Sequence, residues 1–188
     1  MIKLLKAAQE LQNVCVHEKW KFCFIGGLAL QRWGEPRLTR DVDLTLLTGF
    51  GNEEQFIQVL LKRFKARMEN ADEFALKNRV LLLLSSDGIG LDIALAGLSF
   101  EESAVKRASR FNFLPDISLR TCSAEDLIVF KAFADRLQDW VDVERILVRQ
   151  GDRLDWRYIK RQLRPLVQMK GAPEILARLE QLKKTIAE

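Results

Sequence analysis

Two aspartates, Asp41 and Asp43, are separated by one residue in a stretch that alternates polar and apolar side chains. On a β-strand, residues i and i+2 point to the same face, so the two carboxylates project together while Val42 and Leu44 face the core. Adjacent carboxylates repel each other, and such a pair is costly without a cation. Mg²⁺ or Mn²⁺, which bind oxygen ligands, would neutralise the pair. The spacing therefore predicts a divalent-metal site on this strand.

A glycine pair, Gly26 and Gly27, follows the short apolar run 22–25 and precedes a predicted helix at 28–33. Glycine lets the backbone approach a phosphate closely, and the N–H groups at the start of a helix can bind the phosphate oxygens. Either feature alone is common, because glycine pairs occur in many turns. Together with the aspartate pair, the glycines favour a site for a phosphate-bearing substrate beside a metal.

A third carboxylate, Asp92, lies in another alternating stretch. Leu91, Ile93 and Leu95 fall on one side of the predicted strand and Asp92 on the other. The Asp87-Gly88 dipeptide just before this stretch is typical of a hairpin turn.

The segments 24–27 and 39–44 resemble the core motif of the nucleotidyltransferase superfamily that includes DNA polymerase beta. In that family a glycine pair, a helix and two carboxylates one residue apart are followed by a third carboxylate on a later strand. Asp92 occupies that place. The resemblance implies two-metal transfer of a nucleoside monophosphate from a nucleoside triphosphate to a hydroxyl, with release of pyrophosphate. It also implies that Asp41, Asp43 and Asp92 are the catalytic and metal-binding residues, with Asp92 as a candidate base.

A closer likeness is to the AbiEii toxin-like branch of this superfamily. Residues 37–43 look like its first motif, and residues 125–142, with Lys131, look like its later helical motif. The resemblance covers about residues 22–147, and this chain is shorter than many such toxins. It implies a toxin with a possible cognate antitoxin, acting on RNA, such as the 3′ end of a tRNA, or on protein. It further implies nucleotide binding by Gly26, Gly27, Arg40 and Lys131.

Lys131 lies toward the apolar side of its predicted helix, where an unpaired lysine is costly. A contact with the triphosphate is favoured, and the alternative is a salt bridge to Asp135 with the lysine stem lying along apolar surface. For the charged residues that follow, an intrahelical charge network is favoured over a catalytic role. These residues are Asp135, Arg136, Asp139 and Asp142.

Arginine and lysine residues leave two further alternatives open. Arg37 and Arg40 flank the acidic pair and could hold phosphate or an RNA backbone, or could balance the charge of the aspartates. From residue 149 to residue 170 basic residues dominate, which fits either a nucleic-acid face or the solvated side of a helix.

The predicted fold is α/β in the α+β sense: a mixed-sheet minimal nucleotidyltransferase core over residues 1–122, with a C-terminal helical bundle over residues 123–188. Helices are predicted from three- to four-residue apolar periodicity and strands from alternation or short apolar runs. The predicted strands are residues 22–25, 41–47, 79–85, 91–95, 111–113 and 117–121. The predicted helices are residues 3–18, 28–33, 52–64, 99–106, 123–137, 140–150, 155–167 and 173–187.

Composition bounds the remaining function classes. The chain has 188 residues, 48% of them hydrophobic, and a formal charge of +4, which is weak support for a polyanionic partner. Its longest apolar stretches are too short to span a bilayer. Cys15, Cys23 and Cys122 fit buried, reduced thiols of a cytoplasmic protein. A single histidine, His17, argues against Ser-His-type or metallo-hydrolase chemistry.

Two other functions are retained as alternatives to nucleotidyl transfer. One is a nucleotidyltransferase fold without turnover that serves as a binding module. The other is an antitoxin or regulatory partner that sequesters a second protein. The presence of Asp92 favours the enzyme over the binding module, and a neighbouring toxin or antitoxin gene would separate these functions.

Overall fold

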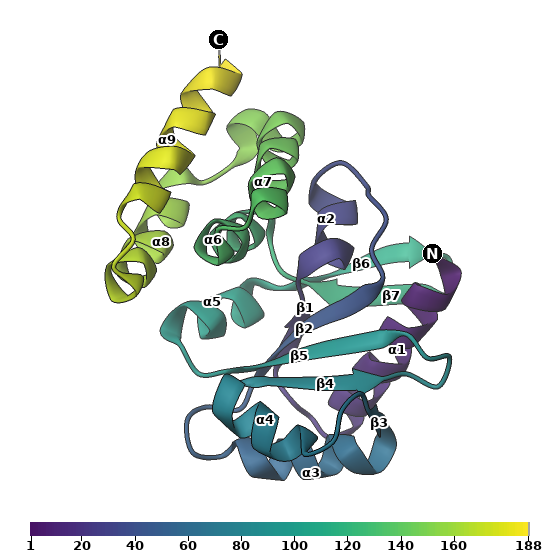
Figure 1. Ribbon diagram of the computed structural model, residues 1–188. Helices are drawn as coiled ribbons and strands as arrows, with labels where there is room; N and C mark the ends of the chain where they lie inside the picture. Colours follow the sequence, from purple (N-terminus) through teal and green to yellow (C-terminus); the bar gives the residue numbers. More distant parts are fainter. Residues whose placement is uncertain (188) are drawn as a thin grey trace. The chain divides into compact units, whose positions relative to one another are not determined.

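The computed structural model describes residues 1–187, and its centre is a seven-stranded mixed sheet with the order β3-β4-β5-β2-β1-β7-β6 (Figure 1). The pairs β2/β5 and β1/β7 are parallel and the others are antiparallel. The predicted α/β architecture with a mixed sheet is thereby confirmed. The strands are β1 (Phe22–Phe24), β2 (Asp41–Leu47), β3 (Lys65–Ala66), β4 (Val80–Leu84), β5 (Gly90–Ala96), β6 (Ser109–Leu114) and β7 (Ile117–Thr121).

Helices occur between the strands and throughout the C-terminal part of the chain (Figure 1). Among the described residues, none forms a helix that is both long enough and apolar enough to cross a membrane. The helices are α1 (Ile2–His17), α2 (Gly26–Trp33), α3 (Glu53–Arg63), α4 (Ala71–Asn78), α5 (Ser99–Arg107), α6 (Ala124–Ala134), α7 (Leu137–Gln150), the short 3₁₀ helix η1 (Gly151–Arg153), α8 (Trp156–Lys170) and α9 (Glu174–Ala187).

The chain forms two compact units. The sheet unit comprises residues 1–28 and 38–122, and the helical unit comprises residues 29–37 and 123–188. The sequence predicted a single boundary after residue 122, whereas the structure also assigns residues 29–37 to the helical unit. Two hydrogen bonds hold that segment within the unit: Gln150 Nε2 donates to the carbonyl of Trp33 at 2.6 Å, and an Arg149 N–H donates to the carbonyl of Gly34.

The main apolar core of the sheet unit lies on one face of the sheet. Val42, Leu44 and Leu46 of β2 point into it and are fully buried. Side chains of α1, α3 and α4 cover this face, including Leu11 and Leu60. Because side chains alternate along a strand, the polar residues between the β2 core positions lie on the opposite face.

Two local predictions were wrong. The helix expected to continue from residue 123 to residue 137 ends at Ala134, because Asp135 adopts a left-handed conformation with φ of 61°. The next helix then begins at Leu137, three residues earlier than expected. In addition, α4 and the two-residue strand β3 formed where no element was predicted.

Candidate active site

Strands β2 and β5 bring the three predicted aspartates to one face of the sheet. The strands are parallel and in register, with Asp43 directly opposite Asp92 and Asp41 opposite Gly90. Directly opposed residues share a face, and so do residues two apart on a strand. Asp41, Asp43 and Asp92 therefore lie on the face opposite the main core, each partly accessible to solvent.

The glycine pair lies against the same carboxylates. Gly26 has φ of +57° and begins α2, and the N–H of Gly27 donates to Asp43 Oδ2 at 3.4 Å. A Cβ on Gly26 would lie 2.1 Å from that oxygen, and one on Gly27 would lie 2.6 Å from Thr39 Oγ1. Both positions need glycine because the side chains of Asp43 in β2 and of Thr39 just before β2 occupy the space that a Cβ would take.

Arg67 joins two of the carboxylates, and sequence reasoning did not identify it. Its Nη2 is 2.5 Å from Asp92 Oδ1 and its Nη1 is 3.5 Å from Asp41 Oδ1. The residue directly follows β3, and its backbone N–H donates to the carbonyl of Leu82 at 3.0 Å. No motif marks this arginine in the sequence, since it lies in a stretch where neither strand nor helix was predicted.

The pKa of Asp92 is raised above the ordinary value for aspartate. Burial is the main cause, and the charge of Asp41 adds to it, while the ion pair with Arg67 opposes both. A raised pKa makes a carboxylate a better proton acceptor near neutral pH, which suits a general base.

The donor set suits a hard divalent cation in its chemistry, because it offers three carboxylates on adjoining strands of one face. In the structure Arg67 bridges Asp41 and Asp92, so a cation already neutralises two of them. Across residues 1–187, no three side chains of His, Cys, Asp or Glu stand in a ready-made metal-binding arrangement. The residues fit a metal in type and in face, and their present geometry is that of the arginine-bridged form.

Arg40 immediately precedes β2 and is exposed to solvent. It forms no hydrogen bond or ion pair with any of the residues that the structure describes, whereas Asp41 and Asp92 both pair with Arg67. An exposed cation next to the acidic pair is compatible with the predicted contact to a nucleotide phosphate.

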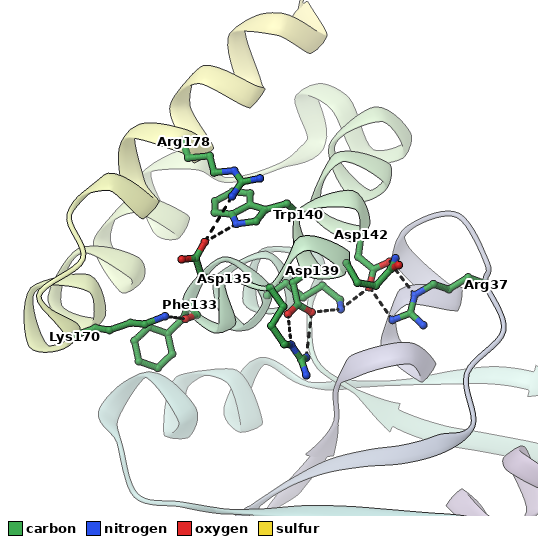
Figure 2. Close-up of polar contacts among 11 residues, drawn as sticks. Arg37, Phe133, Asp135, Asp139, Trp140, Asp142, Lys170 and Arg178 are labelled. Atoms are coloured by element: carbon green, nitrogen blue, oxygen red, sulfur yellow. Dashed lines mark hydrogen bonds and ion pairs between the residues drawn. The ribbon is translucent and has the colours of Figure 1, made fainter.

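Lys131, the remaining predicted nucleotide-binding residue, lies in α6 of the helical unit and is buried. Its Nζ is 3.1 Å from Asp139 Oδ1 and 2.7 Å from Asp142 Oδ2. These two aspartates project from α7 toward a shared set of cations (Figure 2). The alternative partner expected from the sequence, Asp135, does not pair with Lys131; the Nε1 of Trp140 donates to it at 2.6 Å.

Two arginines complete this ion network. Arg37 donates to both oxygens of Asp142 at 2.9 Å, and Arg136 donates to Asp139 through Nε at 2.6 Å (Figure 2). Burial opposes ionisation of each aspartate, yet the hydrogen bonds from arginine and the charge of Lys131 outweigh it. The pKa values of Asp139 and Asp142 are consequently lowered. Sequence reasoning did not pair Arg37 with Asp142, because 105 residues separate them.

Several basic residues between positions 149 and 170 are used within the helical unit. Lys160 pairs with Glu180 at 2.8 Å, and Lys170 donates to the carbonyl of Phe133 at 2.7 Å (Figure 2). Arg153 donates to two backbone carbonyls at the end of α7. These contacts give the basic run an intramolecular role.

Comparisons with known proteins identify the family of the chain. The family model described as "Nucleotidyl transferase AbiEii toxin, Type IV TA system" matches residues 11–187. No curated protein sequence matches the chain.

Among solved structures, the lincosamide antibiotic adenylyltransferase LnuA, with lincomycin bound, is similar with a TM-score of 0.52 and 16% identity. That alignment covers 75% of this chain and 94% of LnuA. The antibiotic-resistance factor ANT(2″)-Ia gives a TM-score of 0.47 at 16% identity, covering 99% of this chain and 92% of that one. At such identity the likeness to LnuA concerns the fold alone.

Proposed function

Because the chain belongs to the AbiEii family of nucleotidyltransferase toxins, we propose that it transfers a nucleoside monophosphate from a nucleoside triphosphate to a hydroxyl of RNA or protein. The convergence of Asp41, Asp43 and Asp92 on one sheet face, next to the Gly26-Gly27 turn, carries the proposal. The chain is a nucleotidyltransferase by family.

Asp41 and Asp43 are the residues that would hold a divalent ion, with Asp92 as the third ligand. An ion bound there supplies neutralisation of the triphosphate charge. The N–H groups at the start of α2 lie beside Asp43, where they can donate to phosphate oxygens. Arg40, exposed next to the acidic pair, is proposed as a further phosphate contact. Lys131 is buried in the helical unit, where Asp139 and Asp142 bind its Nζ, so no phosphate contact is assigned to it.

The transfer step follows from the chemistry of the substrates. The acceptor oxygen forms a bond to the α-phosphorus, and the bond from that phosphorus to the oxygen of pyrophosphate breaks. The proton of the acceptor hydroxyl goes to Asp92, whose pKa is raised by burial. Pyrophosphate leaves with the electron pair of the broken bond.

The acceptor and the biological setting are proposed more broadly. The 3′ end of a tRNA, another RNA or a protein hydroxyl would all present the required nucleophile. The family description supports a toxin controlled by a cognate antitoxin. The three buried cysteines fit action in the cytoplasm, where thiols stay reduced.

Labelling tests the proposed function directly. The protein would be incubated with Mg²⁺, total cellular RNA and each α-labelled nucleoside triphosphate, and products resolved on gels. Wild type should label RNA or protein, whereas Asp43→Asn and Asp92→Asn should lose labelling. Asp87→Asn, in an exposed turn of the same unit, is the matched control and should label normally. Full labelling by either active-site variant would refute the assignment.

A further inference from the structure

A cavity of about 790 Å³ lies in the sheet unit, away from the three aspartates. It lies where β1 leaves most of β7 without a strand partner on that side. β1 begins at Phe22 and pairs with β7 only through Phe24 and Thr121. The side chain of Gln12 occupies part of this gap, donating to the carbonyl of Ser118 at 2.8 Å and accepting from the N–H of Arg120 at 2.9 Å.

The lining of this cavity is strongly basic. Five cationic side chains line it and Glu102 is the one acidic residue among them. Within residues 1–187, none of the five pairs with a carboxylate, in contrast to the bridged cations Arg67 and Lys131. The five are Lys19, Lys21, Lys106, Arg110 and Arg120.

Two of these cations lie directly across from each other on neighbouring strands, an arrangement that destabilises the strand pair. Arg110 of β6 lies directly opposite Arg120 of β7, so both side chains point to the same face. Like charges at directly opposed positions destabilise a strand pair. Arg120 donates to the carbonyl of Val105 at 3.0 Å, near the end of α5, which partly accounts for it. Arg110 has no such partner among the described residues.

Helix ends explain part of the lining but leave the rest unexplained. Lys106 belongs to the last turn of α5, and Lys19 comes just after α1, so both can offset the negative ends of helix dipoles. The helix dipoles do not explain the charges of Arg110, which lies on an exposed edge strand, or of Lys21. An anion bound in the cavity would neutralise all of these charges together.

The strand register places Arg120, and Arg110 opposite it, on the same sheet face as the aspartates. Arg120 is adjacent to Thr121, which pairs with the core-facing Phe24, so Arg120 points the other way. Cys23 opposite Thr45 continues that face to Asp43. Along β2, Leu47, which lines the cavity, lies roughly 13 Å from Asp43 and roughly 20 Å from Asp41 at the usual strand rise. The cavity is therefore a separate site on the catalytic face.

We propose that this cavity binds the phosphate groups of a nucleotide or oligonucleotide at a site distinct from the three aspartates. Arginine and lysine are the side chains that recognise phosphate, and arginine can do so with two parallel hydrogen bonds. Trp20 and Leu47 add apolar wall against which a base can lie. The site does not depend on catalysis, so it holds phosphate whether or not the chain transfers nucleotides.

Fluorescence anisotropy with a short, labelled single-stranded RNA tests this inference, in EDTA so that no metal contributes. The double variant Lys106→Glu with Arg110→Glu should bind about tenfold more weakly or worse, and its dependence of log K on log salt should be shallower by about 1.4. The control is Lys62→Glu with Lys77→Glu, which makes the same charge change in the last turns of α3 and α4. It should bind like wild type.

Competition distinguishes the two sources of phosphate. If the ligand is a nucleic-acid strand, unlabelled oligomer should displace the labelled RNA. If the ligand is a free nucleotide, adenosine monophosphate should displace the labelled RNA at a total phosphate concentration similar to that of the competing oligomer. The inference would be overturned if wild type bound neither the oligomer nor adenosine monophosphate. It would also be overturned if the Lys106→Glu, Arg110→Glu variant bound the RNA as tightly as wild type. The milder Lys106→Gln with Arg110→Gln variant guards against misfolding, with thermal unfolding as the check. The triphosphate-labelling assay stays independent of these outcomes.

Discussion

The carboxylate of Asp43 can lie over the first turn of α2 because Gly26 carries no side chain, and the absence of a side chain on Gly27 makes room for Thr39. At Gly26 two constraints coincide, a positive φ and an occupied volume. Gly88, in the turn between β4 and β5, has a positive φ of +74°, but a Cβ placed on it would meet nothing within 4 Å. A side chain at Gly88 would meet only the strain of the left-handed backbone, whereas a side chain at Gly26 would meet that strain and a clash with Asp43.

Gly26→Ala is expected to lower the free energy of unfolding by at least about 2 kcal/mol, because the new methyl group displaces Asp43. Gly88→Ala is the matched control and should cost about 1 kcal/mol, the strain of the left-handed backbone alone. Urea unfolding followed by circular dichroism measures both. Equal losses in the two variants would mean that the contact with Asp43 is unimportant for stability.

Arg67 neutralises Asp41 and Asp92 in the structure, so a divalent ion at these carboxylates competes with it. We expect Arg67→Ala to bind Mn²⁺ more tightly, by up to about fivefold, since a partly exposed ion pair contributes up to about 1 kcal/mol. Isothermal titration with Mn²⁺ alone measures this. Lys65→Ala, on the neighbouring strand residue, is the control. Weaker binding in the Arg67 variant would show instead that the arginine holds the carboxylates ready for the metal.

At the scale of elements, α6 and α7 are joined by buried charges. Asp142 is completely buried and binds Arg37, Lys131 and Gln138, so its removal leaves cations without their partner. A broken buried pair is costly because the remaining charge stays desolvated. An ion network therefore helps to hold the helix pair together, beside the buried apolar residues of both helices.

Asp142→Asn should lower the free energy of unfolding by about 3 kcal/mol at neutral pH. The pKa of Asp142 is lowered in the folded protein, so its charge stabilises the fold above the unfolded-state pKa of about 3.9 and this contribution disappears as the pH falls through the lower folded value. The difference between wild type and variant should thus narrow below about pH 4. Asp152→Asn, at an exposed position, is the control; a difference independent of pH would contradict the assignment.

Elements with clear periodicity were predictable, and those set by distant contacts were not. The aspartate alternation of β2 and the Asp87-Gly88 turn gave correct strands, because local pattern decides both. By contrast, α4 is bounded by Asn70 and Arg79, which adopt left-handed conformations without being glycine. Asn70 is of a type that commonly begins helices, but Arg79 does not signal a helix end in sequence, because its left-handed conformation depends on the surrounding structure.

The candidate site shows the same division. The shared strand face of Asp41 and Asp43 follows from a two-residue spacing, so sequence suffices for that pair. The register that sets Asp43 opposite Asp92 depends on strand pairing across 49 positions. The family resemblance predicted only that a third carboxylate, Asp92, comes from a later strand. The Arg67 bridge required a strand of two residues to bring the arginine there, which no local pattern encodes.

At the scale of the molecule, neither unit is a continuous stretch of chain. Residues 29–37 belong to the helical unit although the sheet unit precedes and follows them. Most of α2 therefore lies in the helical unit, while its first residues, with the glycine turn, lie in the sheet unit. One helix thus belongs to both.

This interleaving has a consequence for synthesis on the ribosome. Arg37 emerges 105 residues before its partner Asp142. At about 5–20 residues per second, the segment waits roughly 5–20 s for the helix that will hold it. During that interval residues 29–37 have been synthesised, but the helix α7 that binds them has not. The order of translation, rather than the order of folding rates, sets the earliest moment at which the helical unit can close.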